Sequence, residues 1–358
     1  MTSLHTTPAW ILRRPPTCTI GATSSARSFV QLLDPHRAPQ VGGQRMTHVF
    51  HHISVMRDDV VALFRDVPSG VVIDGTLGGG GHAGALLAAR DDVAVLGVDR
   101  DASARFAASE HLKSFGDRVH IVAGTFGELT EIVTSATEWI AGRPIVGVLL
   151  DLGVSSPQLD DPERGFSFRH EAVLDMRMDA SSGETAAQLI ERIDVLELRD
   201  ELRQNGEGRF ATAIARSLKA SLPSTTSELV AAVESAVPPS ARRRGHVAAR
   251  TFQALRILVN RENDELRDAL PAASAVLTVG GVMVILSYHS GEDRVTKEFF
   301  ASQATGGCSC PPALGCVCGA LPRFRVLRNS AVLPGEAEVN SNPRARSARL
   351  RAAWKVRA

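Results

Sequence analysis

The clearest candidate for a functional site is a loop in which several glycines follow an acidic side chain. Asp74 ends a short β-branched run, and Gly75-Thr76-Leu77-Gly78-Gly79-Gly80-Gly81-His82 follows it. Glycines at such a place let the backbone approach a ligand closely, and the amides at the start of a following helix face that ligand. The spacing Gly79-x-Gly81-x-x-Gly84 also matches a dinucleotide fingerprint. We expect a nucleotide-like ligand here, although such a cluster can also be only a tight turn.

A second acidic residue supports a ligand role for this loop. Asp99 ends the next apolar run, a place from which a carboxylate accepts hydrogen bonds from ribose hydroxyls. Its alternative role is to cap the next helix, because Asp101 and Ser103 follow. Asp74 stands four residues before Gly78, and this arrangement resembles methyltransferases that use S-adenosylmethionine more than it resembles dinucleotide enzymes.

A third run supplies candidate catalytic residues. It reads Leu150-Asp151-Leu152-Gly153-Val154-Ser155-Ser156-Pro157-Gln158. Since ligands of open α/β sheets bind beyond the carboxyl ends of the strands, this run should face the glycine loop. Ser155, Ser156 and Pro157 resemble the motif of amino-methyltransferases, in which acceptors hold an exocyclic amine. Such acceptors, with alignment to a methyl sulfonium, raise the reactivity of a cytosine or adenine amine. The alternative is that residues 155–157 form only a turn.

The aromatic residue of that motif is absent from this run. Phe166 or Phe168 could stack on the target base, or both could belong to the core.

Alternating strands and helices must position these residues. Apolar and β-branched runs predict strands at 71–74, 94–99, 119–122 and 145–151, with helical composition between them at 83–89 and 103–115. Such alternation predicts a parallel sheet with helices on both faces. After a Gly-Gly turn at 280–281, a further buried strand follows.

The alternation stops between about residues 160 and 244. The composition there predicts helices at 185–206, 209–220 and 226–237, and no strand. We therefore predict an α/β domain made of residues 46–159 and 245–358, with a helical domain inserted at 160–244. Residues 1–45 hold one acidic residue, Asp34, and are rich in Thr, Ser, Pro and Arg. We expect a disordered leader, or a true translation start at Met46.

Composition excludes several classes of protein. The 40 Lys and Arg residues nearly balance 39 Asp and Glu, for a net charge of +1, and 44% of residues are hydrophobic. These values are typical of a globular protein and argue against disorder throughout. The sequence contains no uninterrupted run of about 18 apolar residues, so it predicts no membrane-spanning helix. Four of the five cysteines lie between Cys308 and Cys318, unlike a secreted disulfide scaffold, so we expect a cytoplasmic protein.

Those cysteines form a cluster of two pairs, Cys308-x-Cys310 and Cys316-x-Cys318. Four thiolates could bind one zinc ion, but structural zinc sites usually use a C-x2-C spacing. We therefore favour free thiols or a disulfide over a metal.

The end of the chain is basic. Residues 323–358 hold nine Lys or Arg residues against Glu336 and Glu338. This segment and Arg242-Arg243-Arg244 fit RNA phosphates, or form solvated basic faces. Residues 347–355 also alternate like a last strand, so part of the segment should be structural.

Several strings together resemble the bacterial 16S ribosomal RNA cytosine-N4 methyltransferase family, known as RsmH or MraW. The similarity covers about residues 48–355, and its most specific strings lie at 74–82, 149–160, 164–168, 174–179, 251–257, 287–290 and 342–347. The resemblance implies a class I S-adenosylmethionine-dependent methyltransferase fold with an inserted helical domain. It also implies a cytoplasmic enzyme that methylates N4 of one cytidine in the decoding region, with 16S rRNA within the small subunit as its partner.

The resemblance further implies which residues contact S-adenosylmethionine. Carried over one by one, these are Gly80, Gly81, His82, Asp99, Phe126, Asp151 and Gln158. Phe126 would be an apolar wall beside the adenine, or ordinary core, and His82 could simply begin a helix. One departure is Gly291, where the family carries Leu, and we expect it to loosen the local turn.

Two other functions stay open at this point. An NAD-dependent oxidoreductase would use the glycine fingerprint, and a non-catalytic RNA-binding assembly factor would use the basic segment. Neither explains the run from Asp151 to Leu159. A homodimer is compatible with the sequence, which does not determine the oligomeric state.

Overall fold

The computed structural model describes residues 54–154, 158, 161–242, 248–311, 317–328 and 330–358. The predicted leader at 1–45 and the candidate catalytic residues Ser155, Ser156 and Pro157 lie outside the described residues.

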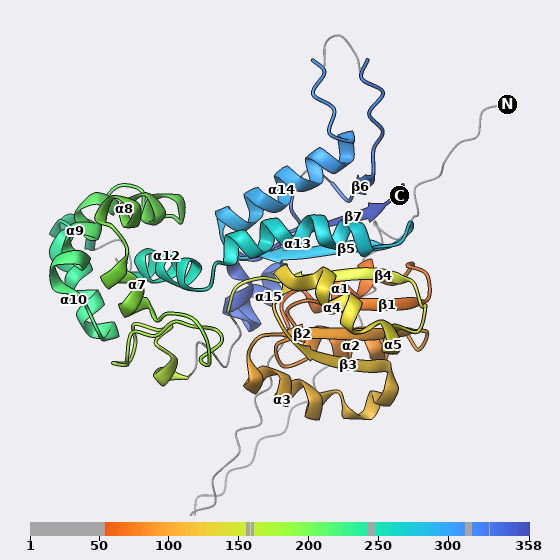
Figure 1. Ribbon diagram of the computed structural model, residues 1–358, viewed down its shortest axis with the longest axis horizontal. Coiled ribbons are helices and arrows are strands. Elements are labelled where there is room, and N and C mark those ends of the chain that lie inside the picture. Colours follow the sequence, from red (N-terminus) through yellow and green to blue (C-terminus); the bar gives the residue numbers. More distant parts are fainter. Residues whose placement is uncertain (1–53, 155–157, 159–160, 243–247, 312–316, 329) are drawn as a thin grey trace, which may run out of the picture. The chain divides into compact units, whose positions relative to one another are not determined.

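The core of the fold is a seven-stranded sheet in the order β3-β2-β1-β4-β5-β7-β6 (Figure 1). Its parallel strands are β1 (Gly70–Asp74), β2 (Val93–Asp99), β3 (Val119–Ala123), β4 (Ile145–Asp151) and β5 (Val282–Ser287). The last strand, β7 (Arg349–Lys355), runs antiparallel to both β5 and β6 (Phe324–Val326). The predicted mostly parallel sheet is confirmed, and so is the predicted strand within 347–355.

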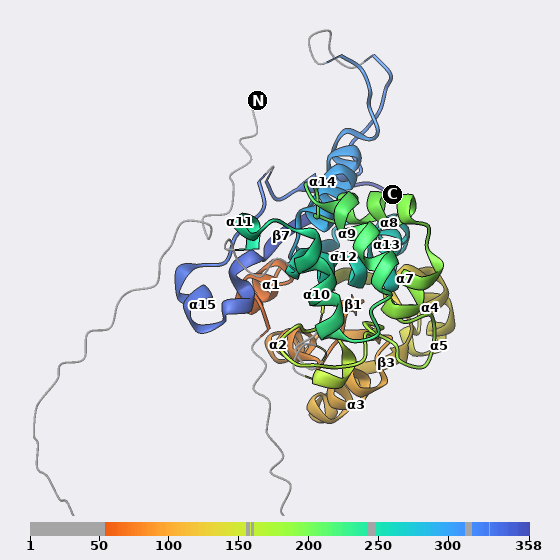
Figure 2. The same ribbon diagram turned by 90° about the vertical axis from the view of Figure 1, so that its left-hand side faces the viewer.

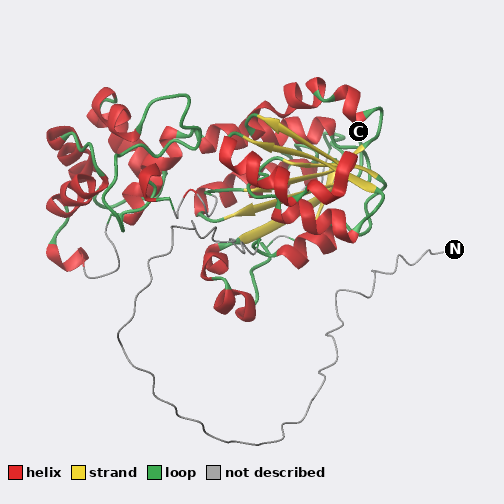
Figure 3. Ribbon diagram, turned by 90° about the horizontal axis from the view of Figure 1, so that it is seen from below, coloured by secondary structure: helices red, strands yellow, loops and turns green. Residues whose placement is uncertain are grey.

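Helices cover both faces of this sheet (Figure 3). Because side chains alternate along a strand, Val72 of β1 packs on one face while Val71 and Ile73 pack on the other. The first face is covered by α1 (Arg57–Leu63), α2 (Gly81–Ala89) and α3 (Ala102–His111). The second is covered by α4 (Leu129–Ser135), α5 (Thr137–Ile140), α13 (Glu262–Val276) and α14 (Ser290–Thr305). Burial on both faces explains why the central strands are apolar throughout.

A separate apolar core holds the predicted helical insertion together. Its helices are α7 (Ala186–Arg192), α8 (Val195–Gln204), α9 (Ala211–Ser221), α10 (Thr226–Ala236) and α12 (Ala249–Val259), which Figure 2 shows gathered in one group. Phe252 and Leu255 of α12 are buried in this core. The helical packing therefore continues past the predicted boundary at residue 244, because the apolar side of α12 faces the other helices.

One predicted helix of this group is broken in two. The expected helix at 185–206 stops at Ile193, which adopts an extended conformation. Asp194 then begins α8 by accepting a hydrogen bond from the Leu196 amide at 2.7 Å. Asp is a strong helix N-cap, so the side chain favours a new start over continuation.

The remaining elements are short. They are α11 (Pro239–Arg242), α15 (Glu336–Ser341) and the 3₁₀ turns η2 (Lys113–Arg118), η3 (Phe126–Glu128), η4 (Pro162–Arg164) and η6 (Pro343–Ser347). Within the described ranges, the helices are too short or too polar to cross a membrane.

Candidate functional site

The glycine loop leads from β1 directly into α2. Gly78 and Gly80 have φ angles of 51° and 79°, in the left-handed region that favours glycine. A Cβ atom on Gly81 would lie 2.2 Å from the Ser54 hydroxyl oxygen, so the Ser54 side chain packs closely against this position. A Cβ on Gly79 would meet no described atom within 4 Å. The loop is thus tightly packed behind Gly81 and open beside Gly79.

Asp99 holds this loop against the end of β2. Its Oδ2 accepts a hydrogen bond from the Gly78 amide at 2.8 Å, and its Oδ1 accepts one from the Asp101 amide at 2.8 Å. The cap of α3 is Asp101 instead, whose carboxylate accepts from the Ser103 amide at 3.0 Å. Burial raises the pKa of Asp99, and the two backbone donors oppose that shift only in part. Asp99 therefore does not cap α3, and that alternative interpretation of Asp99 is wrong.

Asp74 and Asp151 lie on neighbouring strands, near His82 of α2. The His82 Nε2 atom is 3.4 Å from Asp151 Oδ2, and both ring nitrogens lack a partner of hydrogen-bond geometry among the described residues. Burial raises the pKa of Asp74 to about 7, against the opposing effects of His82 and the Thr76 amide. Burial lowers the pKa of His82, but Asp151 and Asp74 outweigh it and leave that pKa raised. Asp74 and His82 are therefore two buried titratable groups beside the Asp151 carboxylate.

Tyr288 completes the surroundings of Asp151 from the end of β5. Its hydroxyl donates to Asp151 Oδ1 at 2.6 Å, and the Asp151 amide donates to the Thr76 hydroxyl at 2.6 Å. Burial, together with the charge of Asp151, raises the pKa of Tyr288, so the phenol stays a proton donor. Sequence reasoning missed Tyr288 and Thr76. A usable signal was that Tyr288, the only tyrosine of the chain, directly follows a strand beside β4.

Gln158 contacts Asp101. From the sequence, Asp101 was connected only with a possible cap of the helix after β2. The Gln158 Nε2 atom donates to Asp101 Oδ2 at 3.2 Å, and an Arg164 nitrogen donates to the same oxygen at 3.1 Å. Arg164 also donates to the carbonyl of Met178 at 2.8 Å. The start of α3 is therefore linked to the segment that leads into the helical group. Sequence reasoning missed the roles of Asp101 and Arg164.

The aromatic candidates separate into two environments. Phe126 begins η3, and its Cβ lies 3.2 Å from where a Cβ on Gly75 would stand, so it is adjacent to the end of β1. Phe166 is buried in the helical core, and Phe168 makes an edge contact with Phe252 at 5.6 Å between ring centroids. Phe166 and Phe168 therefore belong to the helical core, and Phe126 packs against the core of the sheet while it also lies beside the glycine loop.

Gly291 occupies a hydrogen-bonded turn after β5. It lies in the first turn of α14 and donates its amide to His289 Nδ1 at 3.1 Å. Glu292 closes the turn from the other side, because its Oε2 accepts from the Tyr288 amide at 2.8 Å. A polar pocket of about 200 Å³ lies beside Gly291, between α14 and the ends of α8 and α12; its lining includes Asn205, Gln253 and His289.

Much of the basic charge near the chain's end has structural partners. Arg349 and Arg351 both donate to Asp293, the latter at 2.7 Å. Lys355 donates to the carbonyls of Ser274 and Leu277 at 2.8 and 2.7 Å. Arg242 donates to the Val237 carbonyl at 3.0 Å, while Arg243 and Arg244 lie outside the described residues. The surface available to phosphates is therefore smaller than the residue count suggested.

Comparison with known proteins adds evidence that is independent of this geometry. The model of the MraW methylase family matches residues 49–356. Ribosomal RNA small subunit methyltransferase H of Heliobacterium modesticaldum is 45% identical over 316 residues, which cover 86% of this chain and 100% of that protein. Its counterpart in Myxococcus xanthus is 47% identical over 310 residues, 86% of this chain and 98% of that protein.

A solved structure, an rRNA methylase from Streptococcus thermophilus, is 12% identical with a TM-score of 0.37 and covers 84% of this chain and 94% of that one. The family match spans the glycine loop, the run after β4 and the last strand alike.

Proposed function

Because the chain belongs to the MraW methylase family, we propose that it methylates N4 of one cytidine in the decoding region of 16S rRNA. Its fold is that of a class I S-adenosylmethionine-dependent methyltransferase, and S-adenosylmethionine is its cofactor. The observation that carries the proposal is the meeting of the glycine loop, Asp99 and Asp151 at the carboxyl edge of the sheet. Ligands of open α/β sheets bind at this edge, beside the point where the strand order reverses.

The residues at this edge fit the cofactor. When bound, S-adenosylmethionine supplies an electrophilic methyl group on a positively charged sulfonium. We propose that Gly80, Gly81, His82, Asp99, Phe126, Asp151 and Gln158 hold it. The open space beside Gly79 offers room for a ligand, and the carboxylates of Asp99 and Asp151 offer polar atoms near it. Asp99 would accept from ribose hydroxyls, and the nearby carboxylates suit a cation.

The reaction requires an activated amine. The lone pair of a cytosine amine is delocalised into the ring, so hydrogen-bond acceptors must orient the amine and receive the proton that it loses. We propose that Ser155, Ser156 and Pro157, with the adjacent Asp151, place acceptors there. Tyr288 holds the Asp151 carboxylate in one orientation. The target base would have to leave its stack to reach this site.

The substrate proposal extends to the helical group. The relatives named above are small-subunit RNA methyltransferases, and we propose 16S rRNA within the small subunit as the partner of this chain. In this proposal residues 46–159 and 245–358 perform the transfer, while the insertion that starts near residue 160 contacts RNA. A cytoplasmic location follows from that substrate.

Mass spectrometry of small-subunit RNA tests the proposal. A deletion strain should lack N4-methylcytidine in 16S rRNA, the wild-type gene should restore it, and the Asp99→Ala gene should not. If the modification persists without the gene, the chain acts instead as a non-catalytic assembly factor. A thermal-shift comparison should show stabilisation by S-adenosylmethionine and none by NAD, which separates the proposal from an oxidoreductase.

A further inference from the structure

The cysteine-rich loop between α14 and β6 is fixed at its base by backbone contacts. Gly306 ends α14 with a left-handed φ of 65°, and a Cβ there would lie 2.2 Å from the Leu321 carbonyl oxygen. The Arg323 amide donates to the Gln303 carbonyl at 2.9 Å. The outgoing and returning segments therefore touch at the base, and the cysteines lie just beyond that contact.

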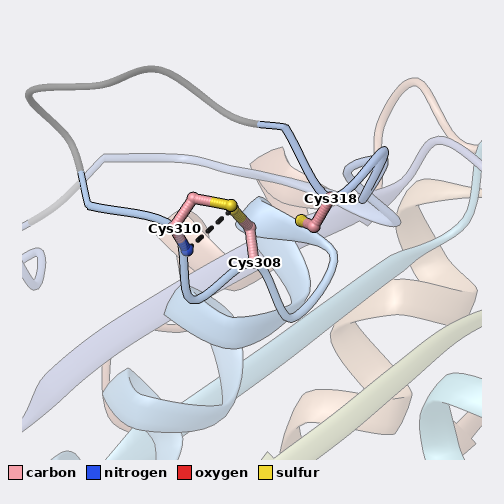
Figure 4. A group of neighbouring side chains, drawn as sticks. All are labelled: Cys308, Cys310 and Cys318. Carbon is pink, nitrogen blue, oxygen red and sulfur yellow. Dashed lines mark hydrogen bonds between the residues drawn. The ribbon is translucent and has the colours of Figure 1, made fainter.

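Three sulfur atoms meet above this base. The Sγ atoms of Cys308, Cys310 and Cys318 all lie within 4.8 Å of one another (Figure 4). Zn–S bonds of about 2.3 Å in a tetrahedron place two sulfurs about 3.8 Å apart. Small side-chain rotations would thus bring these thiols to the spacing of a zinc site. Cys316 lies outside the described residues.

Apolar packing does not account for this convergence. None of the described residues in 308–311 and 317–320 is buried. Two large apolar side chains next to the cysteines in sequence are turned to solvent, with Val317 88% and Leu321 52% exposed. Segments without a core of their own are usually held by disulfides or metal ions.

A backbone amide faces one of the three sulfurs. The Cys310 amide donates to Cys308 Sγ at 3.4 Å. Hydrogen-bond donors of this kind stabilise negative charge on sulfur.

We propose that Cys308, Cys310 and Cys318 bind one Zn²⁺ ion, which fixes the loop between α14 and β6. The tight C-x-C spacing argued against a metal when the pairs were considered alone. The folded loop changes that argument, because it brings ligands from its two ends to one point. Three thiolates leave one tetrahedral position for a fourth ligand. Each thiol releases its proton to solvent on binding, so affinity should rise with pH.

Metal analysis of the full-length protein is the first test. Protein purified under reducing conditions should carry about one zinc per chain by plasma mass spectrometry. Cys310→Ser should reduce that content at least about tenfold, as expected for a lost ligand. The matched control is Cys18→Ser, which changes a cysteine of the N-terminal segment and should keep the zinc. Circular dichroism checks that each variant is folded.

Cobalt substitution supplies a readout that does not depend on the metal retained during purification. Reduced, metal-free protein titrated with Co²⁺ should develop thiolate-to-cobalt charge-transfer absorption, and Cys318→Ser should lose it. The proposal is overturned if reduced wild-type protein shows neither zinc nor this absorption. Stoichiometric iron or copper, or an intramolecular disulfide found by mass in freshly isolated protein, would also overturn it.

Discussion

At the scale of single residues, the three carboxylates at the strand ends lie in different environments. Asp99 is held by two backbone amides, Asp74 is fully enclosed, and Asp151 receives the Tyr288 hydroxyl. These differences in environment let each side chain be tested separately.

Asp99→Ala should weaken S-adenosylmethionine binding by about 10- to 100-fold. A lost hydrogen bond to a charged group costs about 1.5–3 kcal/mol, and the Gly78 amide loses its acceptor as well. Isothermal titration calorimetry measures the change, with the exposed Asp91→Ala as control. Equal affinity in the Asp99 variant and the wild type would contradict the assigned role.

Tyr288→Phe should slow single-turnover methylation by about fivefold, because one hydrogen bond of about 1 kcal/mol no longer orients Asp151. The phenyl ring keeps the packing beside Gly153. Cofactor affinity measured by calorimetry should change less than the rate. An unchanged rate would show that the hydroxyl is dispensable.

Asp74→Asn should gain stability relative to the wild type as pH rises. The folded-state pKa of Asp74 is about 7, above its ordinary 3.8, so the stability from its protonated form is complete below about pH 3.8 and is lost as pH rises through about 7. Asn does not ionise. Between about pH 5.5 and 8, the free energy of unfolding of Asp74→Asn should rise by up to about 2 kcal/mol relative to that of the wild type. Urea denaturation at both pH values measures it, and a constant difference would refute the argument.

At the scale of elements, caps decide where helices begin in the helical group. Thr185 and Thr225 form capping boxes with Gln188 and Glu228, and Asp194 begins α8 just after α7 ends. The segment is therefore two helices although its composition favours one.

Asp194→Ala should lower the free energy of unfolding by about 1 kcal/mol, since the Leu196 amide loses its acceptor. Urea denaturation measures the loss. Asp194→Asn should retain most of the stability, because Asn caps nearly as well as Asp. Equal losses in both variants would point to the charge rather than the cap.

At the scale of the whole molecule, the near-zero net charge conceals an uneven use of basic residues. Arg351 and Lys355 belong to β7 and have partners inside the protein, while Arg349 also contacts Asp293 but keeps half of its side chain exposed. Others nearby, such as Arg346, are exposed.

Arg351→Ala should reduce the free energy of unfolding by about 2 kcal/mol, because Asp293 loses its 2.7 Å partner in a largely buried site. Arg346→Ala should stay within about 0.5 kcal/mol of the wild type. Chemical denaturation compares the two variants. Similar stabilities would contradict a structural role for the Arg351–Asp293 pair.

The sequence by itself determined six strands of the sheet, the glycine loop and the acids at the strand ends, but not the short strand β6 or the strand order. Strand periodicity and turn glycines are local properties, so residues 71–74, 94–99 and 145–151 could be assigned as strands without a structure. The family match rests on the same local strings.

Only the tertiary structure decided which side chains meet. The Tyr288–Asp151 bond spans 137 residues, and the Arg164–Asp101 bond spans 63. The addition of α12 to the helical core and the meeting of the three cysteine sulfurs depend equally on folding. No local pattern marks such pairs, because their distances are set by how strands and helices pack rather than by spacing along the chain.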